Sequence, residues 1–468
     1  MALLNEDRLF PTDTRTRALA RELYDSVKNL PIISPHGHTD PRWFAENEPF
    51  PDPAALFVTP DHYVFRMLHS QGIPLEALGV PRVAGGEVET DPRKIWRLFA
   101  DGFHLFRATP SRIWLNHAFQ EVFGVTERLS ADTADAIYDQ INDCLSQDAF
   151  RPRALFERFN IEAIATTESA IDDLRWHRMI LESGWEGRVT TTYRPDAVID
   201  PDVDGFAQNV QILGEMAGED ATTWTGYLAA HRNRRAFFKT LGATASDHGH
   251  PTARTEDLPQ AEAANLFGTA LQGKCTADEA DRFRGHMLTE MARMSLEDGL
   301  VLQIHPGSVR NHSADVFAGF GRDKGYDIPT RTDYVTALRP LLNAVGGRSE
   351  LTIIVFTLDE TSYARELAPL AGVYPALKLG PPWWFNDSYE GMMRFREMTT
   401  ETAGFYNTVG FNDDTRAFCS IPARHDVARR VDCAYLATLV ETGRLDRDEA
   451  AEVAQDLTYR LAKQAYRL

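Results

Sequence analysis

The sequence lacks the features that mark several large classes of protein. Its 468 residues include only 4 cysteines and no Cys-x-x-Cys pair, so neither a disulfide framework nor a thiolate zinc site is indicated. No apolar run has the length of a membrane span, and the N-terminus lacks the basic-then-apolar order of a secretory signal. We therefore expect a cytoplasmic protein with no membrane partner, in which the cysteines are small buried side chains.

Positive charge is scarce as well. The formal net charge of −19 would repel nucleic acid and an anionic membrane surface, so we expect neither as a partner. An anionic substrate would have to be held by local arginines. The hydrophobic content of 43% is ample for a large core, and we find no internal repeat or low-complexity segment. One chain reveals no interface, so the sequence leaves the formation of a homo-oligomer open.

Two histidines separated by one glycine follow the first short apolar run. Ile32 and Ile33 predict the end of a buried strand, and His36 and His38 come next. Side chains alternate along extended backbone, so both imidazoles would point the same way, as ligands of a divalent metal do. Taken alone, so short a pattern arises by chance and favours the plainer explanation of two unrelated loop histidines. The position favours the metal site, because strand ends carry the chemistry of a β/α barrel.

Seven further strands are predicted downstream, alternating with helical patterns. This alternation is typical of a parallel sheet with helical crossovers, and eight strands predict a (β/α)8 TIM barrel. The further strands are expected at residues 161–167, 188–194, 242–247, 300–305, 351–357, 374–380 and 405–411. We expect one domain over residues 1–468.

The stretch between the first two strands, at about residues 41–151, contains helical patterns and proline-rich turns but no clear strand. We interpret it as a helical insertion above the catalytic mouth, where it could act as a lid. It carries His62 and Tyr63 in the segment Asp61-His-Tyr-Val-Phe-Arg66. Packing of a surface helix would also explain these two rings, so their interest depends on reaching the mouth.

Polar and aromatic side chains follow most of the predicted strands, at the edge where barrel enzymes place catalytic groups. These residues are His36 and His38 after the first strand, Arg194 after the third, Asp247 after the fourth, His305 after the fifth, Trp383 and Trp384 after the seventh, and Asp414 and Arg416 after the eighth. Each has a plainer explanation, such as a surface arginine, a helix cap, a core histidine or a packed tryptophan. Coincidence at one edge is improbable, so we interpret them as one site.

Two adjacent aspartates compete for the eighth-strand position. Alternation places Asp414 and Arg416 on one face, so we choose Asp414 over Asp413. Two imidazoles and one carboxylate suit zinc or a similar divalent ion and leave positions open for water or substrate. Asp247 is interpreted as orienting a bound water or His305.

Together these motifs resemble the uronate isomerases, the glucuronate isomerase branch of the amidohydrolase superfamily, over nearly the whole chain. The matching motifs are His-x-His at 36 to 38, Asp-His-Tyr-x-x-Arg at 61 to 66, Thr-Tyr-Arg-Pro at 192 to 195, Ser-Asp-His-Gly at 246 to 249, His305, Trp-Trp-Phe-Asn-Asp at 383 to 387, Asp-x-Arg at 414 to 416, and Ala-Arg-His-Asp at 423 to 426. The resemblance implies a distorted TIM barrel and one metal, usually zinc, held by His36, His38 and Asp414.

The resemblance also implies an open-chain hexuronate substrate in hexuronate catabolism, with D-glucuronate converted to D-fructuronate and D-galacturonate to D-tagaturonate. The implied substrate contacts are Arg194, Arg416, His305 and a tryptophan of the pair Trp383 and Trp384, and we place His62 with them. The chain departs from the family pattern at Gly37, where cysteine is frequent, at Asp413, where threonine is usual, and at residues 166–169, where an Asp-Asp-Pro turn is common. The last two departures bear on substrate preference.

Aldose–ketose isomerisation moves a proton from C2 to C1 through an enediol, which requires a base and a proton shuttle. We expect Asp414 to take the C2 proton and Tyr63 to relay a proton between O1 and O2, with His305 and Asp247 completing the catalytic set. Guanidinium groups are planar and permanently charged, which suits the binding of a carboxylate. Local arginines could therefore bind an anionic substrate although the net charge of the chain is negative.

Two alternatives remain open at the level of the sequence. A mononuclear metal-dependent hydrolase of the same superfamily would use similar ligands. Binuclear members are less similar, because the fourth strand here ends in Asp247 without a bridging lysine and the sixth ends in Thr357-Leu-Asp359 without histidine. A catalytically inactive barrel that senses a sugar acid would lack a ligand or the Asp-x-Arg motif, and both are present.

Overall fold

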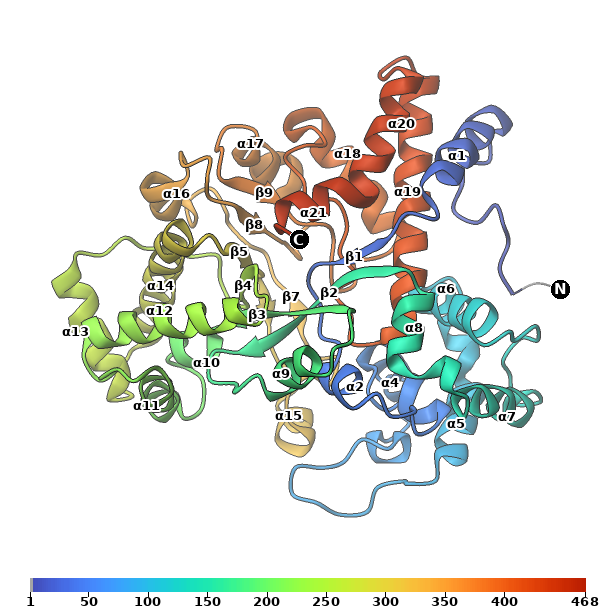
Figure 1. Cartoon of the computed structure of the whole chain (residues 1–468), viewed down its shortest axis with the longest axis horizontal. Coiled ribbons are helices and arrows are strands. Elements are labelled where there is room, and N and C mark those ends of the chain that lie inside the picture. The colour runs from blue at the N-terminus through green and yellow to red at the C-terminus, as the bar shows by residue number, and fades with distance from the viewer. Residues whose placement is uncertain (1–2) are drawn as a thin grey trace.

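The computed structural model describes residues 3–468, and its centre is a curled sheet of parallel strands surrounded by helices (Figure 1). Within those residues the sheet has seven strands in the order β1-β2-β3-β4-β5-β8-β9. They are β1 (Ile32–Ser34), β2 (Ile161–Ser169), β3 (Arg188–Arg194), β4 (Ala245–His248), β5 (Val301–Ile304), β8 (Ile353–Val355) and β9 (Leu377–Leu379). The α/β class and seven of the eight expected strands are therefore confirmed.

The eighth barrel position is not a strand, which corrects the prediction at residues 405–411. Only Thr408 makes an isolated bridge, to Leu379 of β9. Beyond it the backbone adopts positive φ at Gly410 (75°) and Asp414 (39°), which an extended ladder does not accommodate. The segment nevertheless reaches β1, where the amide of His38 donates to the carbonyl of Thr415 over 3.1 Å. The barrel is distorted because a loop, rather than a strand, occupies this position.

The segment between β1 and β2 is helical, and its helices gather on one side of the sheet in Figure 1. They are α2 (Pro41–Glu46), α3 (Pro53–Phe57), α4 (His62–His69), α5 (Pro92–Asp101), α6 (Pro110–His117), α7 (Ala134–Leu145) and α8 (Pro152–Arg158). Three of them begin at Asp-Pro pairs, where Asp40, Asp52 or Asp91 caps the first turn. Their apolar cluster includes Ile32 of β1 and Ile164 of β2, so the segment packs on the barrel. The division of the chain into domains stays a prediction.

The remaining helices surround the sheet or extend from it. They are α1 (Thr14–Val27), α9 (Arg175–Glu182), α10 (Asp196–Ile199), α11 (Phe206–Ala217), α12 (Trp224–Thr240), α13 (Gln260–Leu271), α14 (Ala277–Asp298), α15 (Ala314–Phe320), α16 (Arg339–Val345), α17 (Ala368–Ala371), α18 (Tyr389–Ala403), α19 (Ile421–Glu441), α20 (Arg447–Gln455) and α21 (Leu461–Ala465). A capping box of Thr276 and Glu279 opens α14. The sequence did not reveal the short antiparallel pair of β6 (Ser308–Val309) and β7 (Ile328–Pro329). Across residues 3–468, no helix combines the length and apolarity needed to cross a membrane.

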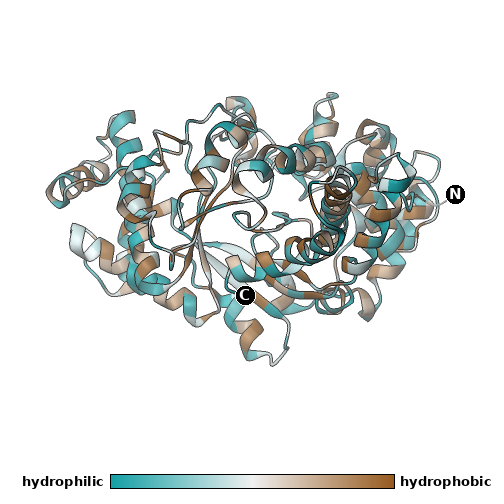
Figure 2. Cartoon of the chain, turned by 90° about the horizontal axis from the view of Figure 1, so that it is seen from above, coloured by the Kyte–Doolittle hydropathy of each residue, from teal (hydrophilic) through white to brown (hydrophobic). Residues whose placement is uncertain are grey.

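Side chains of the strands separate into an inner and an outer set. Leu302 and Ile304 of β5 belong to the cluster under the surrounding helices, whereas Val301 belongs to a separate cluster with Ala245 of β4. This alternation identifies Val301 and Ala245 as inward-facing residues. Figure 2 shows helices of mixed hydropathy around the sheet, as expected where one face of each helix meets a core.

Tyr466, next to the C-terminus, packs in the same inner cluster and is fully buried. In Figure 1 the helix that it follows, α21, lies close to the strands in the middle of the view. Its hydroxyl accepts a hydrogen bond from Asn412 over 3.4 Å, two residues before Asp414. The last turn of the chain therefore helps to fill the barrel.

Replacement of Tyr466 by alanine should lower the free energy of unfolding by about 3 to 5 kcal/mol, because it removes a buried aromatic ring and leaves a cavity. Urea-induced unfolding of both proteins measures the difference. Tyr406 is the matched control, since 53% of its surface is exposed, and its alanine variant should lose less than about 1 kcal/mol. Equal losses in the two variants would contradict the role of Tyr466 in the core.

Candidate metal and substrate site

His36 and His38 follow β1, and the loop in the eighth barrel position brings Asp414 beside them. The Nε2 atoms of His36 and His38 lie 3.6 and 3.3 Å from Oδ1 of Asp414. Two ligand atoms about 2.1 Å from one ion, at a tetrahedral angle, are separated by about 3.4 Å. The three side chains therefore form a group that could hold one divalent ion.

The charge states of this group also suit a metal. Burial by itself would raise the pKa of Asp414, but the two histidines outweigh it and hold the pKa far below its usual value. Burial lowers the pKa of His38. The carboxylate is therefore ionised, which is the form that coordinates metal ions.

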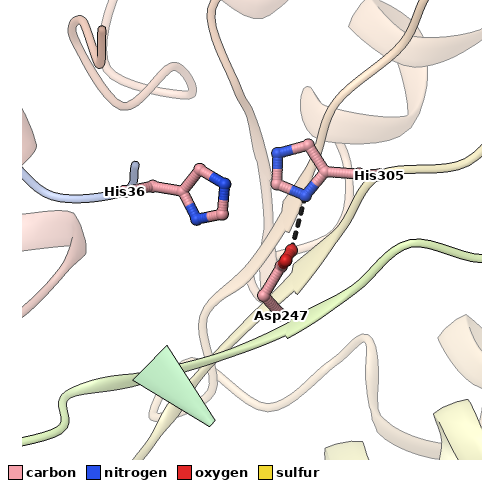
Figure 3. A group of neighbouring side chains, drawn as sticks. All are labelled: His36, Asp247 and His305. Carbon is pink, nitrogen blue, oxygen red and sulfur yellow. Dashed lines mark hydrogen bonds and ion pairs between the residues drawn. The ribbon is translucent and has the colours of Figure 1, made fainter. Parts of the chain in front are cut away.

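His305, which follows β5, stacks beside His36 with ring centroids 4.7 Å apart. Its Nδ1 lies 2.6 Å from Oδ1 of Asp247, as Figure 3 shows. His36, Asp247 and His305 form a second group that could hold a metal ion. In this second group Asp247 and His305 are already joined by a short hydrogen bond.

Asp247 also faces an arginine. Its Oδ2 lies 3.4 Å from Nη1 of Arg194. Burial would raise the pKa of Asp247, but His305 and Arg194 hold it well below its usual range, so the carboxylate is ionised. Nε2 of His305 is buried and has no hydrogen-bond partner among the residues described. Asp247 thus orients His305 and leaves Nε2 available for a ligand.

Two arginines reach the site, one from the end of a strand and one from the loop in the eighth barrel position. Arg194 ends β3 and donates through Nε to Oδ2 of Asp196 over 2.9 Å. Arg416 pairs with Asp323 at 3.8 Å. Arg416 and His38 both line a cavity of about 570 Å³, together with Glu168, Asp323 and Lys324.

The insertion brings aromatic rings to the same side of the barrel. The ring of Trp384 lies 4.6 Å from that of His62 and 4.7 Å from that of Tyr63. The indole N–H of Trp384 donates to the carbonyl of Asp327 over 2.6 Å. Trp383 instead stands edge-on to His305 at 5.0 Å. Trp384 is thus engaged in packing against α4, whereas Trp383 adjoins the histidine pair.

Tyr63 lies in a buried polar network that the sequence did not reveal. Its hydroxyl donates to Asp387 over 3.0 Å, and Arg424 donates to Oδ2 of the same carboxylate over 2.6 Å. Burial and the charge of Asp387 raise the pKa of Tyr63 well above its usual value. The phenol is therefore protonated and acts as a donor. Its proposed relay role stays a prediction.

The structure separates the two adjacent aspartates. Oδ2 of Asp413 lies 3.0 Å from Nε2 of His425, and Asp413 is not part of the group formed by His36, His38 and Asp414. A Cβ built on Gly37 would lie 3.7 Å from Oδ1 of Asp413. Two of the three departures from the family pattern, Gly37 and Asp413, are therefore neighbours in space.

A sequence model of the glucuronate isomerase family matches residues 3–466. The chain belongs to this family. A uronate isomerase from Rhizobium meliloti is 67% identical over 466 residues, which cover 100% of this chain and 99% of that protein. The crystal structure of glucuronate isomerase from Caulobacter crescentus shares 61% identity and a TM-score of 0.97, covering 99% of this chain and 97% of that one.

A more distant member of the family has the same fold. The crystal structure of a uronate isomerase from Thermotoga maritima is 28% identical, with a TM-score of 0.91 and 99% of each chain covered. The family resemblance and the distorted TIM barrel expected from the sequence are therefore confirmed.

Glu168 lies within the third departure from the family pattern, at residues 166–169. It accepts a hydrogen bond from the hydroxyl of Thr191, and Nε2 of His177 lies 3.8 Å from its Oε2. Burial raises the pKa of Glu168 from 4.5 to about 8, partly opposed by hydrogen bonds from Thr166 and Thr191. Folding thus favours the protonated form.

The contribution of Glu168 to the free energy of unfolding should have its full value below pH 4.5 and should decrease as the pH rises to about 8. In the variant Glu168→Gln this titration is absent, so its melting temperature relative to the wild type should rise between pH 5 and pH 8. Calorimetry at several pH values measures the difference. The exposed Glu182 on α9 is the control, and Glu182→Gln should show no such trend. A constant offset for Glu168→Gln would contradict the assignment.

Proposed function

We propose that the protein interconverts aldohexuronates and ketohexuronates, D-glucuronate with D-fructuronate and D-galacturonate with D-tagaturonate. The observation that carries the proposal is the convergence of a metal-ligand group, His36, His38 and Asp414, with two arginines at one edge of the barrel. Membership in the glucuronate isomerase family supports the reaction class. The expected cytoplasmic location stays a prediction.

One divalent ion held by His36, His38 and Asp414 is the cofactor that we propose. Two imidazoles and one carboxylate at these separations suit Zn²⁺, with positions left for substrate oxygens. When bound, such an ion would act as a Lewis acid toward substrate oxygens.

The arginines and aromatic rings would bind and orient the sugar acid. Arg194 and Arg416 offer guanidinium forks to the carboxylate, which is the recognition that a chain of net charge −19 requires. Trp383 is the better placed of the two tryptophans, since it stands against His305. His62 forms part of the wall through its contact with Trp384.

Proton transfer would use the remaining polar groups. The ionised Asp414 takes the proton from C2, and the protonated Tyr63 relays a proton between O1 and O2. His305, oriented by Asp247, presents Nε2 to a substrate hydroxyl. The hydrolase alternative is not favoured, because the family and its solved members are isomerases.

Purified protein supplied with Zn²⁺ should convert D-glucuronate or D-galacturonate to the corresponding 2-keto sugar acid. In heavy water, NMR should show loss of the C2 proton signal as the ketose appears, because the reaction removes that proton. Prior chelation should abolish turnover, and restored Zn²⁺ should return it. Uptake of oxygen-18 from water into product, without ketose, would instead indicate a hydrolase.

Asp414→Asn should bind metal at least about tenfold more weakly, since it loses one charged ligand, and should lose nearly all turnover. Metal content after dialysis and the rate of ketose formation measure the two effects separately. The neighbouring Asp413→Asn is the control, because Asp413 contacts His425 rather than the metal group, and it should retain its metal. Full turnover by metal-loaded Asp414→Asn would show that another group takes the C2 proton.

A further inference from the structure

We infer that Asp196 and Gly249 position the guanidinium of Arg194 for the carboxylate of the substrate, an inference that rests on the function proposed above. Neither residue belongs to the metal group or to the expected substrate contacts. Asp196 begins α10, and Gly249 directly follows β4. Together they connect the ends of two neighbouring barrel strands around the Arg194 side chain.

The carboxylate of Asp196 is shared between a side chain and a backbone amide. Its Oδ2 accepts the hydrogen bond from Nε of Arg194 over 2.9 Å. The N–H of Gly249 donates to Oδ1 and Oδ2 over 3.2 and 3.0 Å. Because the amide belongs to the end of β4, the carboxylate cannot follow a rotation of Arg194 without losing its second donor.

Gly249 leaves space for the Arg194 guanidinium in its present position, and its backbone conformation is ordinary. A Cβ at this position would collide with Nη2 of Arg194 and lie 3.0 Å from Oδ2 of Asp196. It would also lie 3.2 Å from Nη2 of Arg310. The guanidinium of Arg194 therefore packs directly against the backbone of residue 249.

A second carboxylate completes the arrangement. Asp196 holds Nε of Arg194, while Asp247 faces Nη1 at 3.4 Å. Two anions that contact two different atoms of a planar group fix its orientation, whereas a single contact leaves the group free to rotate. Burial would lower the pKa of Arg194, but Asp247 and Asp196 raise it above the usual value, so the group stays charged.

A purely structural role is the competing explanation, since Asp196 also joins two strand ends. Asp200 at the end of α10 provides the comparison. It pairs with Arg284 at 2.6 Å, and its side chain is about as exposed as that of Asp196, at 18% against 24%. Its arginine is not one of the groups assigned to the substrate, so loss of this pair should affect stability and leave substrate binding unchanged.

The experiment uses full-length, metal-loaded protein and compares Asp196→Asn with Asp200→Asn. Asp196→Asn should raise the KM for D-glucuronate about tenfold or more and leave kcat within about threefold. The reason is that a misplaced arginine weakens binding of the sugar acid equally in the ground state and in the transition state. Calorimetric binding of D-gluconate, which lacks the reacting carbonyl, should weaken by a similar factor. Asp200→Asn should change neither quantity.

A double-mutant cycle distinguishes action through Arg194 from any other effect. In the Arg194→Met background, Asp196→Asn should weaken D-gluconate binding by less than about twofold, because the group that it positions is gone. Additive losses would overturn the inference, as would an unchanged KM in Asp196→Asn. Gly249→Ala provides an independent variant, and its KM should rise like that of Asp196→Asn.

The two proposals can fail separately in this design. If the wild type binds D-gluconate but isomerises no hexuronate, the proposed function fails, while the calorimetric cycle still decides the role of Asp196. If the wild type isomerises hexuronates and Asp196→Asn matches Asp200→Asn, only the positioning role fails.

Discussion

The hydrogen bond from the amide of His38 to the carbonyl of Thr415 is the contact on which the site depends. It joins the first barrel strand to the loop that occupies the eighth position, and it places Asp414 within ligand distance of both histidines. A regular eighth strand would have continued the sheet but would not have turned the Asp414 backbone into the left-handed region. The distortion of the barrel and the assembly of the metal group are therefore one structural feature.

The positive charges near the metal group are paired with carboxylates from neighbouring segments. Arg194 and Arg416 are half-buried, and each has an acidic partner. Arg194 has Asp196 and Asp247, and Arg416 has Asp323. These pairs leave some guanidinium donors for a substrate carboxylate, so local recognition of an anion is compatible with the strongly negative chain.

Helix α4 of the insertion packs against the segment that follows β9. Trp384 packs against His62 and Tyr63 of α4, while Asp387 accepts hydrogen bonds from Tyr63 and Arg424. The residues that would close over a substrate are thus held by contacts between segments more than 300 positions apart. A substitution in one segment is expected to disturb the other.

The sequence by itself determined the elements whose signals are local. Apolar runs located seven strands, whereas the assignment of His36, His38 and Asp414 as metal ligands stays a prediction. The choice of Asp414 over Asp413 assumed an extended eighth strand, and that segment is instead a loop. Only the tertiary structure decided the course of the eighth segment and the partners of Asp196, Asp387 and Asp323. Gly410 and Asp414 depart from extended geometry through contacts that no local pattern encodes. An aspartate in a loop looks the same in sequence whether it caps a helix, coordinates a metal or positions an arginine, because its neighbour in space is chosen by the packing of distant strands.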